Sequence, residues 1–244
     1  MRKFVLAAGL FIACVAAAAH GQGYSPAAQR VLAQARTASG GAGWSYLRGW
    51  HETGRQGGAP YESWFDTLRY GMRIETHEAG GLHVRGFNGQ GEWQILLGGA
   101  TTGGDERVAV ARARTDAFLG AYGFFYPGRF DARGEYVGVR KRDGRAFNVV
   151  NVKPWGGEPR ELWFDSRSHL LGFIVDRASP RPSTVQLSDY RRVGPLQVPF
   201  RFTAVGDPPG ASDTRQVESV VFTPADRNMF SLPRSSGPQP VAEP

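Results

Sequence analysis

The chain of 244 residues carries a net charge of +7, almost all of its positive charge as arginine, and a single cysteine, Cys14. This length is enough for one large all-β domain with its own core, and one cysteine excludes a disulfide framework and a cysteine-based zinc site. Because there is no dense basic run, the charge predicts no nucleic-acid partner; it suits an anionic membrane surface or a solvated, arginine-rich exterior.

Residues 1–21 have the layout of a secretory signal peptide. A basic pair at 2–3 precedes an apolar run over 4–19, and small and polar residues follow. A membrane anchor and lipidation of Cys14 are the alternatives. The run is short and alanine-rich for an anchor, and apolar residues follow the cysteine where a lipoprotein would begin a polar tether. We therefore expect cleavage near Gly21 and a periplasmic protein.

A capped helix opens the expected single domain, which spans residues 22–232. Ser25 suits an N-cap and Pro26 a first helical position, and the glycines at 40–41 end the element. Short glycine-containing loops then predict antiparallel hairpins. The first strands are expected at Trp44–Glu52, Tyr61–Tyr70, Met72–Glu78, Leu82–Phe87 and Glu92–Leu96.

A second helix interrupts the strands. Asp105 is the expected N-cap, and Glu106 adds an acidic residue to the first turn. Apolar residues recur at helical spacing, which predicts an amphipathic helix with an aromatic end. These residues are Ala111, Thr115, Phe118, Leu119 and Tyr122.

Strands resume after this helix, and Asp143-Gly144 is the strongest hairpin signal among them. The expected strands are Glu135–Arg142, Arg145–Val152, Arg160–Asp165, His169–Arg177, Thr184–Val193, Leu196–Val205 and Arg215–Phe222. A last helical turn is expected near Phe230, and the proline-rich tail at 233–244 is expected to be disordered.

One stretch, residues 161–176, is apolar on both faces of both of its strands. Leu162 and Phe164 share one face of the first strand and Trp163 takes the other, while Phe173 and Ile174 divide the second strand in the same way. A sheet with one face in water would be apolar on one side only. The pattern therefore predicts a fold that is mainly β (α+β), with a large curved antiparallel sheet wrapped around two helices.

No catalytic or metal-binding motif stands out. His77 and His83 would face each other only across a three-residue loop, and no third ligand has a recognisable spacing. Asp66-Thr67 and Asp165-Ser166 begin like an aspartic-protease triplet but lack its glycine, so we interpret Asp66 as an exposed strand carboxylate and Asp165 as a turn former. We expect no cofactor, no metal and no enzymatic activity.

Several segments together resemble a known family. They include Gly40–Trp44, Gly58–Asp66, Phe147–Pro154, Leu162–Asp165 and Ser188–Arg191. Over residues 25–230 the chain resembles the LolA/LolB-like superfamily of outer-membrane lipoprotein-sorting proteins, and it is also similar to the region that precedes bacterial retropepsin-like protease domains. The resemblance implies a half-open barrel closed by helices that holds an acyl chain or another apolar ligand.

Function is therefore expected to be the non-enzymatic binding of a lipid or a lipoprotein acyl chain by a monomer, with an envelope protein as a possible further partner. Two alternatives remain open: an envelope protein-interaction module with a self-packed core, and a hydrolase whose site would gather His51, His77 or His169 with carboxylates. Large aromatic side chains can line an apolar cavity. The candidate ligand-binding residues are Trp64, Trp93, Phe118, Trp163 and Phe173.

Overall fold

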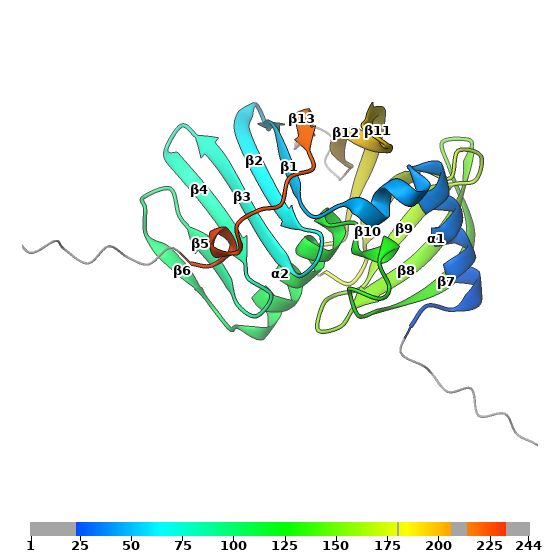
Figure 1. Ribbon diagram of the computed structural model, residues 1–244, viewed down its shortest axis with the longest axis horizontal. Helices are drawn as coiled ribbons and strands as arrows, with labels where there is room; N and C mark the ends of the chain where they lie inside the picture. Colours follow the sequence, from blue (N-terminus) through cyan, green and yellow to red (C-terminus); the bar gives the residue numbers. More distant parts are fainter. Residues whose placement is uncertain (1–22, 180, 206–213, 233–244) are drawn as a thin grey trace, which may run out of the picture.

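The computed structural model describes residues 23–179, 181–205 and 214–232 (Figure 1). The expected signal peptide, with Cys14, and the tail at 233–244 lie outside the described residues. The helical elements are α1 (Pro26–Ala38), the 3-10 helix η1 (Gly41–Tyr46), α2 (Arg107–Gly120) and the 3-10 helices η2 (Gly123–Phe125) and η3 (Arg227–Phe230). The strands are β1 (Trp50–Gln56), β2 (Ala59–Asp66), β3 (Gly71–Glu78), β4 (Gly81–Phe87), β5 (Glu92–Ile95), β6 (Thr101–Gly104), β7 (Ala132–Arg142), β8 (Arg145–Pro154), β9 (Arg160–Asp165), β10 (Leu171–Asp176), β11 (Ser183–Val193), β12 (Leu196–Val205) and β13 (Thr214–Val221).

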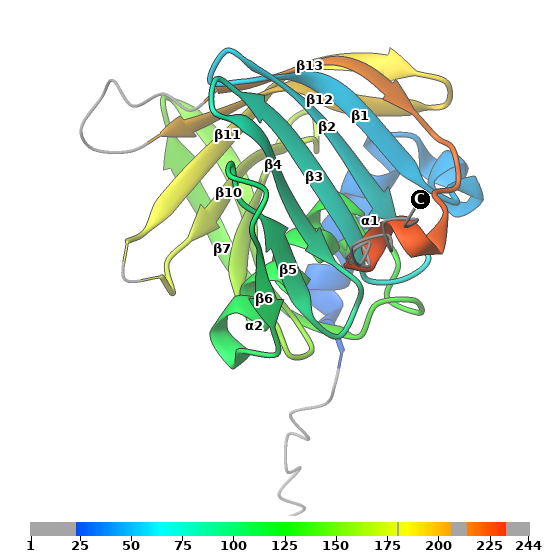
Figure 2. The same ribbon diagram turned by 90° about the vertical axis from the view of Figure 1, so that its left-hand side faces the viewer.

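All of these strands belong to one antiparallel sheet, in the order β6-β5-β4-β3-β2-β1-β13-β12-β11-β10-β9-β8-β7. The chain runs from β1 out to the edge strand β6, and α2 then carries it to the opposite edge, β7. From there it returns strand by strand to β13, which pairs with β1 in the middle of the sheet. Figure 2 shows how far the sheet curls, with β3 and β4 on one side and β10 and β11 on the other. The expected curved antiparallel sheet is confirmed.

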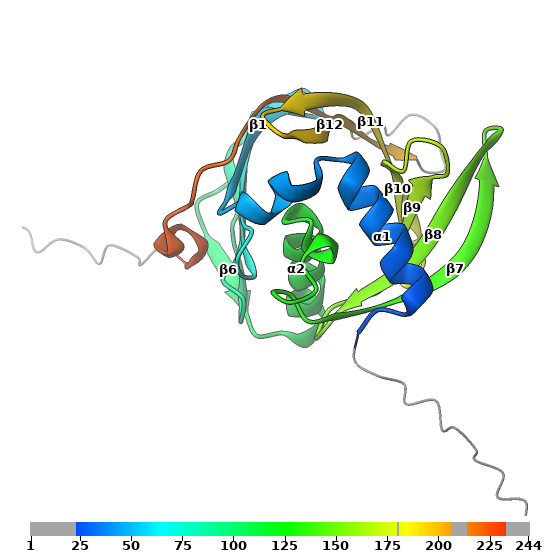
Figure 3. The ribbon, with the colours of Figure 1, turned by 45° about the vertical axis from the view of Figure 1, so that its right-hand side comes forward.

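Both α-helices lie inside the arc of strands (Figure 3). Helix α1 begins as expected, because the Ser25 hydroxyl accepts a hydrogen bond from the Ala28 amide and Pro26 takes the first helical position. Helix α2 is capped by Glu106 instead of Asp105, with its carboxylate accepting from the amides of Ala109 (2.7 Å) and Val108 (3.1 Å). These hydrogen bonds lower the pKa of Glu106, and the one from the Ala109 amide has the larger effect. No helix of the described segments is long and apolar enough to cross a membrane.

The strand pattern differs from the prediction at the start of β1 and at β6. The strand expected from Trp44 begins only at Trp50, because residues 41–46 form η1 instead. Gly40, at φ 139°, makes this turn, and a Cβ there would lie 2.5 Å from the Leu196 side chain. The short edge strand β6 was not predicted, since its Thr-Thr-Gly-Gly sequence lacks a strand signal.

The two apolar faces of residues 161–176 pack on two different partners. Phe164 faces inward, with its ring 6.2 Å from that of Phe124 beside α2. On the outer face Trp163, Phe173 and Val175 form a separate cluster with Phe147 and Val149 of β8. This outer cluster is covered in part by arginines: the Arg142 guanidinium lies 4.7 Å from the Phe173 ring centre and that of Arg145 lies 5.4 Å from the Phe147 ring centre.

The turn between β9 and β10 is formed by Asp165, as the sequence predicted. Its Oδ1 accepts hydrogen bonds from the amides of Arg167 (3.0 Å) and Ser168 (2.8 Å), and Arg145 donates to Oδ2 (2.8 Å). Burial raises the pKa of Asp165, but these hydrogen bonds outweigh it and hold the pKa at about 2. Asp66 also forms a turn, by accepting from the Leu68 amide, and it is buried instead of exposed.

Candidate functional site

A half-enclosed cavity of about 740 Å³ lies between the inner face of the sheet and α2. In most strands alternate residues line the cavity, as a pleated sheet requires, whereas β10 contributes Leu171 and Ile174 because its register shifts between Leu171 and Phe173. On one side the apolar lining is Trp50, Phe65, Met72, Ile74, Leu119 and Tyr122. On the other side it is Leu171, Ile174, Val185, Leu187 and Phe202. The cavity extends to the ends of the hairpins β1–β2, β3–β4 and β10–β11.

Tyr122 anchors the helix side of this cavity. It has a left-handed backbone conformation (φ 53°, ψ 40°), which ends α2 and leads into η2. Its ring lies 4.9 Å from that of Trp44 and 5.2 Å from that of Trp50. Burial raises the pKa of Tyr122, and the negative charge of Glu52 raises it further. The phenol therefore stays neutral at physiological pH. The helix end is thereby fixed against the wall that a ligand would contact.

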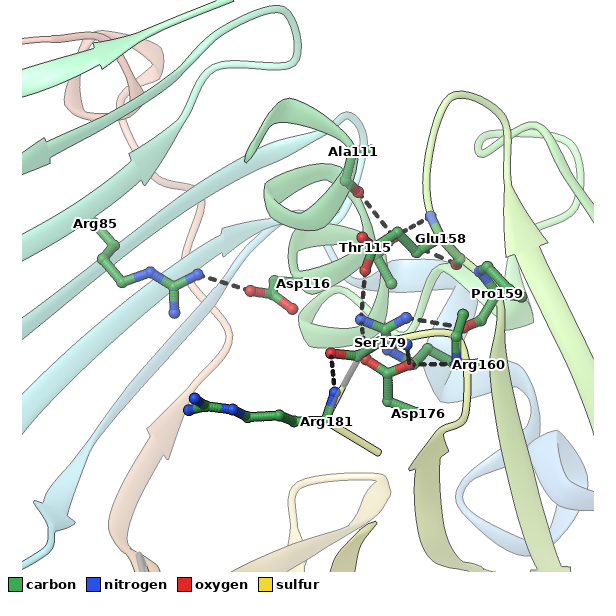
Figure 4. A network of polar contacts seen from close by, with 11 residues as sticks. Arg85, Ala111, Thr115, Asp116, Glu158, Pro159, Arg160, Asp176, Ser179 and Arg181 are labelled. Carbon is green, nitrogen blue, oxygen red and sulfur yellow. Dashed lines mark hydrogen bonds and ion pairs between the residues drawn. The ribbon is translucent and has the colours of Figure 1, made fainter. Parts of the chain in front are cut away.

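Ion pairs hold α2 and the β8–β9 loop at the cavity edge (Figure 4). Arg85 of β4 donates to Asp116 of α2 at 2.8 Å, which joins the sheet to the helix. Arg160 of β9 contacts Asp176 of β10 at 2.9 Å and Glu158 at 2.8 Å. Arg85, Asp116, Arg160 and Asp176 all line the cavity, so its polar groups are positioned by one another.

Thr115 ties the middle of α2 to the same loop. Its hydroxyl donates to the Ala111 carbonyl at 2.9 Å and accepts from the Glu158 amide at 2.7 Å (Figure 4). A Cβ at Gly157 would lie 2.7 Å from this hydroxyl, so the loop can approach the helix only with glycine at that position. The helix that forms one side of the cavity is therefore fastened to the sheet by both main-chain and side-chain hydrogen bonds.

A second polar group sits on the wall formed by β1, β2 and β13. The Glu52 carboxylate is 3% exposed and accepts hydrogen bonds from the Tyr61 hydroxyl at 2.6 Å and from Trp50 Nε1 at 3.3 Å. Arg215 Nε lies 3.5 Å from Glu52 Oε1. Burial and the nearby Glu52 charge raise the Tyr61 pKa, so its hydroxyl remains a donor. Glu52 and Arg215 bring charge into an otherwise largely apolar wall.

None of the five aromatic residues predicted from the sequence is among those that line the cavity. Trp64 stacks on the His51 ring at 4.8 Å, on the opposite face of β2 from Phe65. Trp93 donates from Nε1 to the Phe230 carbonyl at 2.8 Å, and Phe118 is buried in the core. Trp163 and Phe173 belong to the outer cluster. The residues next to them, Phe65, Leu119, Leu162 and Ile174, lie on the inner side of the fold or in its core.

The four histidines at described positions, His51, His77, His83 and His169, do not gather in one cleft. His77 pairs with Leu82, and His83 pairs with Thr76, because the β3–β4 turn has two residues. His83 lines the cavity, whereas His51 contacts Glu62 at 3.0 Å beside Trp64. Across the described ranges no group of three or more His, Cys, Asp or Glu residues is placed to hold a metal ion.

Sequence reasoning missed the polar cavity residues, above all Glu52 and Arg215. One signal was present: Trp50, Glu52 and Gly54 share a face of β1, so a carboxylate sits between residues of a buried type. Its partner Arg215 is far away in the chain and reaches it only through the pairing of β1 with β13.

Comparison with known proteins supports the fold. No protein-family model and no curated protein matches the sequence. Among solved structures, a LolA superfamily protein from Nitrosomonas europaea matches with a TM-score of 0.53 at 10% identity, over 84% of this chain and 97% of that chain. A DUF1329 family protein from Desulfovibrio piger ATCC 29098 matches with a TM-score of 0.52 at 10% identity, over 85% of this chain and 98% of that chain. The chain therefore has a LolA-like fold.

Proposed function

We propose that this protein is a periplasmic, non-enzymatic carrier that holds the acyl chain of a lipid or lipoprotein in its half-barrel cavity. The observation that carries the proposal is the cavity of about 740 Å³ between the curved sheet and α2, with apolar side chains on both sides. Its volume falls within the range of roughly 300–1,000 Å³ that is usual for ligand pockets. The alternative, an interaction module with a self-packed core, would leave no such space.

The apolar part of the wall suits binding by the burial of apolar surface. Removing apolar surface from water supplies about 25 cal/mol per Å², and the aromatic and aliphatic lining offers that surface on both sides of a chain. Among the described residues, four carboxylates line the wall. Glu78 lies at the end of β3, whereas Glu52, Asp116 and Asp176 each face an arginine. This pairing favours a binding role for these groups over general acid–base catalysis. The signal-peptide pattern and the LolA-like fold support a place in the periplasm.

The length of the bound chain should set its affinity. Because each buried methylene contributes about 0.8 kcal/mol, lengthening a fatty acid by two methylenes should lower Kd roughly tenfold until the chain outgrows the cavity. Displacement of a fluorescent fatty acid by a series of unlabelled ones measures this dependence. Affinities that do not change with chain length would contradict binding inside the cavity.

A further inference from the structure

Arg215 differs from the other arginines of the cavity wall. Arg85 and Arg160 both have carboxylate partners within 2.9 Å, and Arg160 also donates to the Pro159 carbonyl. No hydrogen bond from the Arg215 guanidinium is found within residues 23–179, 181–205 and 214–232, and its Nε is buried without a hydrogen-bond partner there. Its contact with Glu52 is an ion pair at 3.5 Å that lacks hydrogen-bond geometry.

Packing nevertheless holds this guanidinium in place. Arg215 lies 3.8 Å from the Phe202 ring centre and 5.8 Å from that of Tyr61, so two aromatic rings fix its position. Its side chain is about a quarter exposed and lines the cavity. A guanidinium has five N–H donors and no acceptor, and a buried donor such as Arg215 Nε that lacks a partner is costly. The site is therefore preorganised for an acceptor that the described part of the chain does not supply.

Glu52 is poorly placed to be that acceptor. Its two oxygens already accept from Tyr61 and Trp50, which orient the carboxylate within the sheet. The ion pair offsets the charge of the arginine in the free protein and leaves the terminal N–H groups of the guanidinium for another partner. Among the other wall residues near Arg215, Phe202 and Ala204 are apolar, and Gln56, which pairs with Arg215 between β1 and β13, is polar but carries no charge.

We propose that Arg215 binds the oxyanion, a carboxylate or a phosphate, of an acidic amphiphile whose chain lies along the apolar wall. This inference rests on the proposed function and names the class of ligand that the cavity takes. Planar N–H donors match the oxygens of both anions, and hydrogen bonds to charged groups are the stronger kind. Ile174 and Val185 line the side of the cavity where the chain would pack.

The test compares ligands that share one chain and differ only at the head: lauric acid, dodecyl phosphate and dodecan-1-ol, at about pH 8, where a carboxylic acid is ionised. The wild-type protein should bind at least one acidic ligand about tenfold more tightly than the alcohol. The double variant Glu52→Gln/Arg215→Met removes both charges and leaves no buried carboxylate unpaired. It should lose this preference and still bind the alcohol.

A charge-matched control is Arg201→Met, since Arg201 is exposed on the adjacent strand β12 and donates to Gln216. It removes one positive charge from outside the cavity and should keep the preference for the acids. The single variant Glu52→Gln, which removes the competing anion, should strengthen that preference. Thermal unfolding of each variant establishes that it is folded at the assay temperature.

The outcomes separate this inference from the carrier proposal. Equal binding of acid and alcohol by the wild-type protein, or a preference that persists in the double variant, would overturn the role of Arg215 and leave the carrier proposal standing. Failure of all three ligands to bind would overturn both. The tighter of the two acids identifies the headgroup.

Discussion

Replacing Ile174 with glutamate should weaken the uptake of lauric acid by on the order of 100-fold while the protein stays folded. Ile174 is half-buried on β10 and faces the cavity. A ligand chain would lose the packing of this side chain, about 1.5–3 kcal/mol, and would also have to desolvate the new carboxylate. A loss of about 3 kcal/mol corresponds to a factor of about 100 in Kd. Isothermal titration calorimetry measures it.

The matched control for this substitution is Val139→Glu. Val139 lies on β7, is 52% exposed and is outside the cavity lining. The Val139→Glu substitution introduces the same charge into another strand of the same sheet, so the uptake of lauric acid should remain at the wild-type level. If Ile174→Glu and Val139→Glu bound lauric acid with equal affinity, the ligand would lie outside the cavity.

Replacing Trp163 with alanine should lower the free energy of unfolding by about 3–5 kcal/mol and leave the affinity of the folded protein for lauric acid unchanged. Trp163 is 7% exposed, and its ring lies 6.1 Å from that of Phe147 and 6.2 Å from that of Phe173. Its Nε1 also donates to the Glu161 carboxylate at 2.9 Å. The substitution therefore removes the centre of the outer cluster and a hydrogen bond. Urea-induced unfolding measures the change.

Trp155→Ala is the control for loss of a tryptophan without loss of packing. Trp155 is 70% exposed in the turn after β8, so its removal should change stability by less than about 0.5 kcal/mol. If Trp163→Ala instead abolished uptake at wild-type stability, Trp163 would contact the ligand, and the assignment of its face would be wrong.

The order of the elements could be predicted from the sequence because local signals specify them. Glycine-containing turns delimit the hairpins, and β9 and β12 have the predicted bounds, Arg160–Asp165 and Leu196–Val205. Ser25 and Pro26 place the start of α1 correctly. These features depend on neighbouring residues alone.

The face of each strand could not be predicted in the same way. In β10 the register shifts between Leu171 and Phe173, so Leu171 lines the cavity while Phe173 packs outside, although alternation predicts one shared face. A shift of this kind reverses every following side chain. The aromatic residues of the candidate set were chosen for their size, and size does not distinguish the outer cluster from the cavity.

Long-range pairing also concealed the polar part of the site. Glu52 and Arg215 come together only because β13 returns to pair with β1 after the chain has crossed from one edge of the sheet to the other. No local pattern joins two residues that are so far apart in the chain. The ion pair of Arg85 with Asp116 likewise depends on how α2 lies across the sheet.

The central claim, that the cavity holds an amphiphile, is tested most directly by native mass spectrometry of protein purified from a bacterial periplasm without detergent. We expect one lipid bound to each protein molecule, lost on extraction with organic solvent and identified in the extract as an acidic amphiphile. A mass of the free protein alone, with no uptake of fluorescent fatty acid and no lipid-dependent rise in Tm, would contradict the carrier function.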